Sequence, residues 1–142
     1  MSSVPTFKAG CLTEGINTVM SKVHLLPEGI VFWELRDETA LGAERVANLI
    51  LEGVQVVGKP RCLLVDMSLG GRGTSHETNI YSRFLKNHPL DAIAVFGLNM
   101  GLRVVVQTVC ILAGFRNIHF FKNKTDALGS LKAIRDRTGD NR

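Results

Sequence analysis

The chain of 142 residues has the length of one ordinary domain and can bury a hydrophobic core of its own. Hydrophobic residues make up 45% of it and charged residues 21%, a balance that excludes an intrinsically disordered chain. The formal net charge is +4 at pH 7, but acidic residues are interspersed with the basic ones, so we expect no nucleic-acid partner.

The cysteines and the apolar segments indicate a cytoplasmic protein that does not enter a membrane. Cys11, Cys62 and Cys110 are widely spaced and form no CxxC pair, so neither a metal knuckle nor a dithiol centre is expected. The amino terminus lacks the basic start and apolar core of a secretory signal. The longest apolar stretch, around residues 104–113, is interrupted by polar residues and is too short to span a bilayer.

The first part of the chain predicts a β-hairpin followed by a helix. Residues 1–17 show little periodicity and form either a tail or an extra edge element. The segments KVHLL (22–26) and IVFWEL (30–35) are rich in β-forming residues and flank the tight turn PEG. After RDET, apolar residues recur on one helical face up to Val57, and GKP (58–60) ends the helix because proline cannot continue it.

Two buried strands and a helix follow. CLLVDM (62–67) and AIAVFGL (92–98) are continuous apolar runs of strand length, typical of strands covered on both faces. Between them, a glycine-rich loop precedes a helix that has Ile80 and Phe84 on one side and is closed by Pro89.

The segment MGLRVVVQTVCILAG (100–114) is ambiguous between strand and helix. Its valines favour a strand, whereas Arg103 and Gln107 lie four residues apart and Gly114 is a suitable helix stop. Because the segment lies between two predicted strands, we predict a mostly buried helix.

The remaining residues complete an alternating pattern of strands and helices. NIHFF (117–121) is the last predicted strand, and Asn123 can cap a final helix. Such alternation predicts an α/β fold with a largely parallel sheet joined by right-handed crossovers. We expect one domain over residues 18–137, with 138–142 as a carboxy-terminal tail.

The stretch LLVDMSLGGRGTSHET (63–78) joins a strand to a helix through glycines. Thr74, followed three residues later by Glu77, fits a capping box and places the helix start near Ser75. Amides at a helix start can hold an anion, but the phosphate-binding spacings GxxxxGK[ST] and GxGxxG are absent. A tight turn is therefore favoured over nucleotide binding.

Three hydroxyl groups in this loop, on Ser68, Thr74 and Ser75, are candidates for a regulatory switch. A phosphate added to one of them would meet the positive end of the helix and the nearby Arg72. The alternative, which we favour, is that Thr74 caps the helix and the serines are ordinary loop residues.

The sequence shows no assembled catalytic or metal-binding set, so we expect no enzyme, no metal and no cofactor. His76 and Glu77 would begin an HExxH zinc motif, but Ile80 stands where the second histidine is needed. No GxSxG nucleophile motif is present. Asp66, at the end of a buried strand, is expected to accept hydrogen bonds from loop amides.

The strand-to-helix loops 67–74 and 97–101 should lie at the same end of the sheet, where open α/β sheets bind ligands. We therefore predict a ligand or partner surface at this end. Besides Ser68, its predicted members are Asp66, Gly70, Gly71, Arg72, Gly73, Asn99 and Arg103.

The apolar helix around residues 104–112 raises a hypothesis of self-association. A core helix is the more common interpretation, but a helix that is apolar all round needs cover on more than one side, and one sheet face supplies only one. A second copy of the chain would supply the rest. The basic residues near the carboxy terminus alternate with acids and lack interleaved aromatics, which favours a solvated face.

The chain resembles the STAS-like family, and more narrowly its small bacterial branch related to the anti-sigma-factor antagonists. The resemblance covers about residues 20–136 and is carried by the hairpin HLLPEGIVFWEL, the strand end LVDMS and the closing HFFKNKTDALGSL. It implies a sheet with helices packed mainly on one face, and a non-enzymatic signalling role through binding of partner proteins.

In the antagonists, the loop after the central strand carries DSSG, whose serine is phosphorylated by a partner kinase. The loop here, GGRGTSHET, keeps Thr74 and Ser75 but lacks the preceding aspartate and the following glycine. We expect a bacterial signalling domain that binds a protein partner and itself. The alternative is a domain that binds a nucleotide or an apolar small molecule in the crevice at the strand ends.

Overall fold

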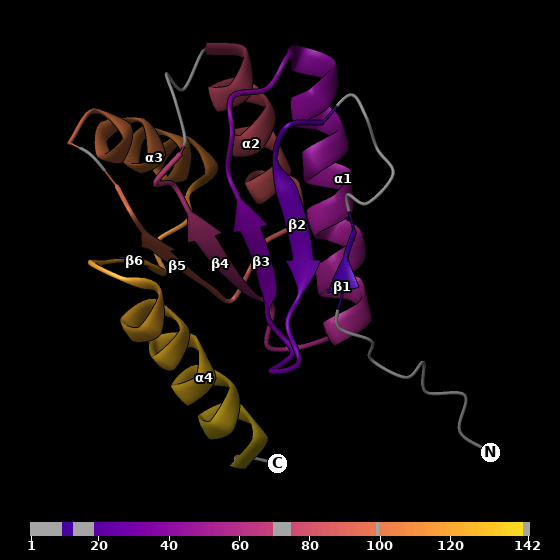
Figure 1. Cartoon of the computed structure of the whole chain (residues 1–142), viewed down its shortest axis with the longest axis vertical. Coiled ribbons are helices and arrows are strands. Elements are labelled where there is room, and N and C mark those ends of the chain that lie inside the picture. Colours follow the sequence, from indigo (N-terminus) through magenta and orange to yellow (C-terminus); the bar gives the residue numbers. More distant parts are fainter. Residues whose placement is uncertain (1–9, 13–18, 70–74, 99, 141–142) are drawn as a thin grey trace.

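A computed structural model of the chain describes residues 10–12, 19–69, 75–98 and 100–140. Within them, one six-stranded sheet is accompanied by four helices (Figure 1). The strands are β1 (Gly10–Cys11), β2 (Lys22–Leu25), β3 (Val31–Glu34), β4 (Cys62–Asp66), β5 (Ala92–Phe96) and β6 (Ile118–Phe121). The helices are α1 (Ala40–Val57), α2 (Ser75–Asn87), α3 (Met100–Ala113) and α4 (Lys124–Asp140).

The sheet is mixed, with its parallel part in the centre and at one edge. β2 and β3 form the predicted antiparallel hairpin, and β1 pairs antiparallel with β2. From β3 to β6 all neighbouring strands are parallel. The α/β fold with a mostly parallel sheet is thus confirmed, and Gly10–Cys11 supply a short edge strand.

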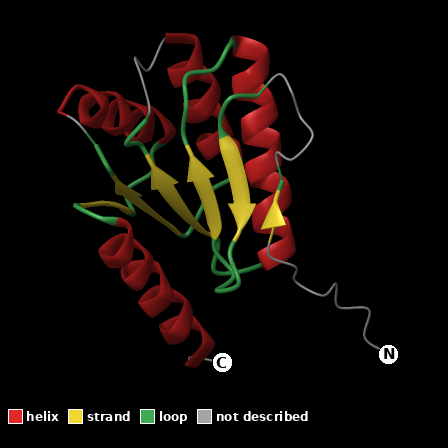
Figure 2. Ribbon diagram, viewed as in Figure 1, coloured by secondary structure: helices red, strands yellow, loops and turns green. Residues whose placement is uncertain are grey.

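Three helices cover one face of the sheet and the fourth covers the other (Figure 2). The parallel strands follow one another across the sheet in chain order. Right-handed crossovers place every connecting helix on the same face when the strands advance in one direction. α1, α2 and α3 therefore share a face, whereas α4 follows the last strand and folds back over the opposite face.

The strands build two cores because successive side chains point to opposite faces. Leu63 and Val65 of β4 pack with α1, α2 and α3, whereas Cys62 and Leu64 pack beneath α4. Cover on both faces explains why β4 and β5 are uninterrupted apolar runs in the sequence.

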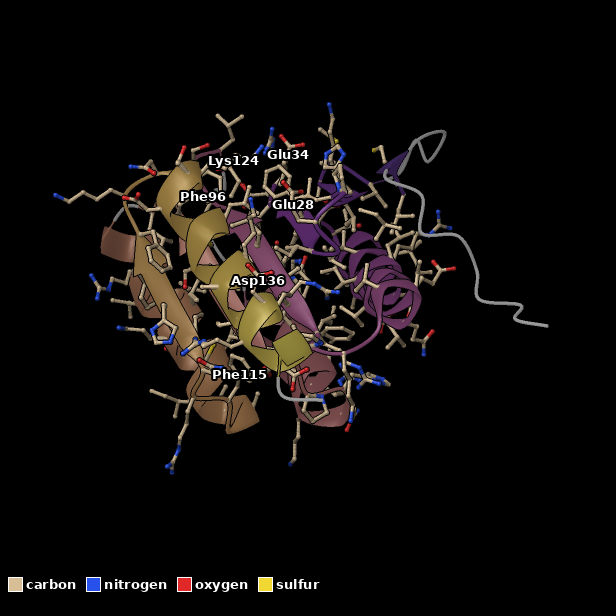
Figure 3. The ribbon with its side chains drawn as sticks, turned by 90° about the horizontal axis from the view of Figure 1, so that it is seen from below. Glu28, Glu34, Phe96, Phe115, Lys124 and Asp136 are labelled. Atoms are coloured by element: carbon tan, nitrogen blue, oxygen red, sulfur yellow. The ribbon has the colours of Figure 1, made fainter. Side chains whose placement is uncertain are left out.

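α4 is fixed at its start by a helix cap and by a cation–π contact. The Asn123 Oδ1 atom accepts a hydrogen bond from the Asp126 amide at 2.8 Å, which confirms the predicted cap. Lys124, at the start of the helix in front of the sheet in Figure 3, holds its Nζ atom 4.6 Å from the ring centroid of Phe32. The helix continues to Asp140, into the segment 138–142 that the sequence predicts as a tail.

α3 is a helix as predicted, but the expectation that it is mostly buried is wrong. Val109 and Cys110 are buried, while Val104, Ile111 and Leu112 are 62%, 77% and 57% exposed. The helices contact each other in the order α1, α2, α3, so α3 stands at the end of the row and is packed against α2 on one side.

Candidate functional site

The loops after β4 and β5 meet at the carboxyl end of the parallel strands, as predicted. The Met67 amide donates a hydrogen bond to the Phe96 carbonyl at 3.0 Å. A Cβ atom at Gly97 would lie 2.8 Å from the Ser68 amide nitrogen, and Gly97 has a φ of 77°. The close backbone approach and the left-handed conformation both require glycine, so the two loops are held in direct contact.

Asp66 organises the loop that leaves β4. Its Oδ1 atom accepts a hydrogen bond from the Ser68 amide at 2.9 Å, and its carbonyl accepts one from the Leu35 amide at 2.9 Å. The carboxylate thus has the loop-amide role expected from the sequence, while Ser68 itself is exposed.

The other residues predicted for this surface are only partly described. Ser75 is the exposed first residue of α2, as the capping pattern predicts, and its role as a regulatory hydroxyl stays a prediction. Arg103 is exposed in the first turn of α3, where its guanidinium carbon lies 4.8 Å from the Phe120 ring centroid and links α3 to β6. The following predicted residues lie outside the described part of the chain: Gly70, Gly71, Arg72, Gly73, Thr74 and Asn99.

A buried glutamate that the sequence does not reveal lies beside the same end of the sheet. Glu38 is 6% exposed, and its carboxylate accepts hydrogen bonds from the Met20 and Ser21 amides at 3.2 and 2.5 Å. Its own amide donates to Glu77 Oε2 at 3.2 Å, and its carbonyl accepts from His76 Nε2 at 2.9 Å. Glu38 therefore ties the residues before β2 to the starts of α1 and α2.

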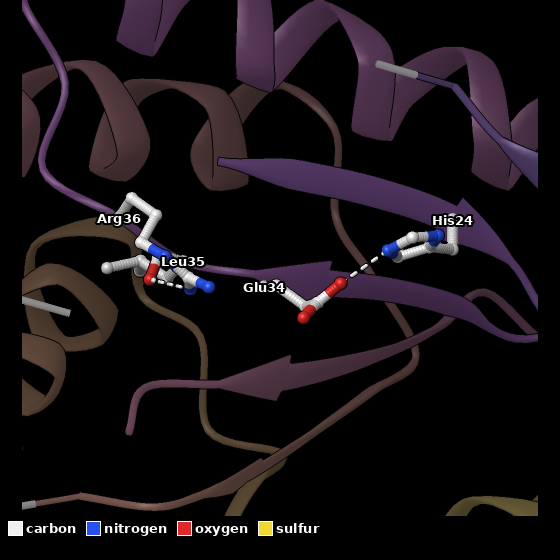
Figure 4. Close-up of polar contacts among 4 residues, drawn as sticks. All are labelled: His24, Glu34, Leu35 and Arg36. Carbon is white, nitrogen blue, oxygen red and sulfur yellow. Dashed lines mark hydrogen bonds and ion pairs between the residues drawn. The ribbon is translucent and has the colours of Figure 1, made fainter. Parts of the chain in front are cut away.

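The α4 side of the hairpin carries a further polar pair. His24 Nε2 and Glu34 Oε2 lie 2.5 Å apart across β2 and β3 (Figure 4). The side chains are about a quarter exposed, so solvent screens the interaction. Among the described residues, no group of three or more histidine, cysteine or acidic side chains could hold a metal ion.

Two of the three cysteines are buried thiols that are poor nucleophiles. Burial raises the pKa of both Cys62 and Cys110 to about 11. Both thiols therefore stay protonated at neutral pH, and the thiolate is the reactive form.

An apolar cavity of about 80 Å³ lies between the sheet and the helices α2 and α3. The rings of Trp33 and Tyr81 meet edge to face in its wall, with 4.9 Å between their centroids. Both residues are buried, yet Trp33 Nε1 and Tyr81 Oη have no hydrogen-bond partner among the residues that the structure describes. Burial, with the nearby carboxylates of Glu77 and Glu38, raises the pKa of Tyr81, so its hydroxyl keeps its proton. Much of the remaining wall is apolar and includes Leu63, Val65, Ile93, Val106, Val109 and Cys110.

The outer side of α3 presents apolar side chains to solvent. Val104, Ile111 and Leu112 are exposed at a spacing that places them on one side of a helix. Thr108 lies between them, and its hydroxyl donates to the Val104 carbonyl at 2.9 Å, so the polar group is satisfied within the helix. We define these four residues as the α3 surface.

No family model matches the chain, and no match was found among curated proteins or among solved structures. The inference of function therefore depends on the residues and their geometry, and the resemblance to STAS-like proteins stays an expectation. In the segments that the structure describes, no helix combines the length and the apolar character needed to cross a membrane.

Proposed function

We propose that this protein is a cytoplasmic, non-enzymatic signalling domain of the STAS-like kind that binds proteins, and that a second copy of the same chain is its partner. The observation that carries the proposal is the exposed α3 surface. All three apolar side chains of this surface are more than half exposed, and the helix that carries them is packed on its inner side.

Contact with another protein would remove these side chains from water. Contiguous exposed apolar patches on monomeric proteins are small, and larger ones commonly mark interaction sites. The Thr108 hydroxyl already has its partner in the Val104 carbonyl, so covering the surface would leave no unpaired polar group there. The α3 surface is therefore suited to a protein–protein contact from which water is excluded.

The spacing of the α3-surface residues along the helix favours packing against the α3 helix of a second copy of the chain. Val104, Thr108 and Ile111 are separated by four and then three residues, which is the alternation found along the seam between two packed helices. In an antiparallel pair related by a two-fold axis, Val104 would meet Ile111 of the partner subunit. The place of α3 at the end of the helix row leaves room for this arrangement.

The neighbouring sheet edge is a less suitable contact between copies. β6 pairs with β5, and no strand follows it in the described sheet. Exposed basic residues flank it, Arg116 before the strand and Lys122 after it. Antiparallel pairing of two β6 strands would bring these like charges together, and charged side chains of this kind commonly guard edge strands.

Replacing one apolar residue of the α3 surface with an acid should separate the subunits. We expect Ile111→Glu to raise the dissociation constant of the dimer at least about tenfold, because a carboxylate would be buried without a partner. Sedimentation equilibrium of the wild type and the variant measures this constant.

The matched control is Val56→Glu, which makes the same kind of change at an apolar residue of α1 that is 46% exposed. This variant should associate like the wild type. Equal dissociation constants for Ile111→Glu and the wild type, or equal weakening by both variants, would contradict the proposal.

A further inference from the structure

Cys11, His24 and Glu34 lie in a row on the face of the sheet that carries α4. Cys11 of β1 is directly opposite His24 of β2 in the antiparallel register. Val23 and Leu25, the neighbours of His24 in its strand, belong to the core beneath α1, α2 and α3, so His24 points to the other face. Directly paired residues point to the same face, and Cys11 therefore lies on that face as well.

The pairing of β1 with β2 brings the side chains of Cys11 and His24 close to each other. The Leu12 amide donates a hydrogen bond to the Val23 carbonyl at 2.6 Å, which makes Leu12 and Val23 a hydrogen-bonded pair. Such pairs alternate along an antiparallel ladder with non-hydrogen-bonded pairs, in which the side chains approach most closely. Cys11 and His24 form the next pair along this ladder. The Cβ atoms in a pair of this kind are about 4.5–5.5 Å apart.

Glu34 orients His24 and determines which of its ring nitrogens carries the proton. His24 Nε2 and Glu34 Oε2 lie 2.5 Å apart (Figure 4). A carboxylate only accepts hydrogen bonds, so Nε2 donates and Nδ1 keeps the lone pair of the neutral ring. A histidine that is oriented by an acid and lies beside a thiol is the arrangement that activates cysteine as a nucleophile.

The environment of Cys11 is typical of a thiol that reacts with molecules from solvent. Cys11 is half-buried, and the side chains of His24 and Glu34 are about a quarter exposed. Two ammonium groups lie on the same face, that of Lys22, directly opposite Glu34, and that of Lys124, over an aromatic ring of β3. Reactive cysteines are typically partly exposed and close to positive charge.

We propose that Cys11 is a nucleophilic thiol that forms mixed disulfides with small disulfide molecules, and that His24, oriented by Glu34, accepts its proton. The proton passes from Cys11 Sγ to His24 Nδ1, and the thiolate attacks one sulfur of the small disulfide. A new S–S bond forms to Cys11 while the S–S bond of the small molecule breaks. The departing thiolate takes the proton from His24 and leaves as a thiol, so the small disulfide is the only co-reactant.

This reactivity goes beyond the binding of proteins and is separate from the α3 surface. β1 and β2 lie at one edge of the sheet, whereas α3 connects β5 to β6 at the other edge. The other two cysteines do not compete. Burial raises the pKa of both Cys62 and Cys110 to about 11, so their thiols stay protonated at neutral pH.

The reaction can be followed with dithiodipyridine, a neutral disulfide that releases one coloured thiopyridone for each thiol it modifies. At neutral pH, one equivalent should react rapidly with the native protein, and peptide mapping by mass spectrometry should place the modification at Cys11. Cys62 and Cys110 should react only after unfolding in denaturant. A first modification at either of these two residues, or no reaction of the native protein, would overturn the proposal.

Two variants test the proton transfer from Cys11. His24→Gln should lower the rate constant at neutral pH at least about tenfold, because the base is lost. Glu34→Gln should lower it severalfold, because an amide does not stabilise the protonated ring. Loosening of β1 would expose Cys11 and raise the rate, so a fall in rate does not come from damage to the strand. The control is His119→Gln, at an exposed histidine of β6, which should react like the wild type.

The pH dependence of the rate separates the loss of a base from a change in access to Cys11. At about pH 10, free thiols lose their proton without the help of a base. The wild type and His24→Gln should therefore react at similar rates at that pH. Equal rates of the two proteins at neutral pH, or a difference that stays the same at high pH, would overturn the role of His24.

Discussion

Gly97 shows how one residue fixes the loop end of the sheet. It adopts a left-handed conformation at the point where the loop after β5 touches the backbone of Ser68. Any side chain at this position would be strained by the backbone angle and would also press on the neighbouring loop. Contact between the two loops therefore depends on the absence of a side chain.

We expect Gly97→Ala to lower the free energy of unfolding by about 1–3 kcal/mol, through left-handed strain and the overlap with Ser68. Urea unfolding followed by circular dichroism measures this change. Gly129→Ala is the control, because its new Cβ atom on α4 would meet no heavy atom within 4 Å. That variant should gain about 0.5–1 kcal/mol from helix propensity. Equal stability of Gly97→Ala and the wild type would contradict the account of the loops.

Residues with local roles could be predicted from the sequence, whereas those with tertiary roles could not. Asn123 and Asp66 bond to amides within three positions, so turn and cap patterns were sufficient to assign them. Glu38 joins three separate segments, and Trp33 meets Tyr81 across the sheet–helix boundary. Nothing in the neighbouring residues signals these contacts, because they arise only when distant elements pack.

At the level of elements, α4 is held against the sheet by contacts with two loops, the turn between β2 and β3 and the connection before β4. The Arg135 Nη1 atom donates to the carbonyls of Gly29 and Pro60, at 2.9 and 3.2 Å. These carbonyls belong to the hairpin turn and to the connection before β4. One side chain thus joins the helix to two separate loops.

Replacing Arg135 by alanine should lower the free energy of unfolding by about 1.5–3 kcal/mol, because charge-assisted hydrogen bonds to two carbonyls are lost. Thermal or urea unfolding provides the measurement. Lys132→Ala, at an exposed position of the same helix, should change stability by no more than about 0.5 kcal/mol. If the two variants were equally stable, Arg135 would not anchor α4.

The exposure of the outer side of α3 could not be predicted from the sequence. The apolar pattern of α3 and Gly114 indicated a helix, but the exposure of Val104 and Ile111 depends on the position of α3 at the end of the helix row. A continuous apolar pattern is the same whether a neighbouring helix or a second chain provides the cover. The apolar pattern therefore indicated that α3 packs against other protein on more than one side, but it did not indicate whether a neighbouring helix or a second chain lies there.

At the level of the whole molecule, the order of the strands explains where the apolar cavity and the α3 surface lie. Parallel strands that advance in one direction place three helices in a row on one face. The last helix of such a row has one packed side and one free side. The inner side of α3 helps to enclose the apolar cavity, and its outer side forms the α3 surface.

The most direct test of the proposed function is the mass of the unmodified protein in solution over a series of concentrations. The chain has a mass of 15.6 kDa, and we expect static light scattering to rise toward twice that value as the concentration increases. A mass that stays at 15.6 kDa up to millimolar concentration would contradict self-association through α3.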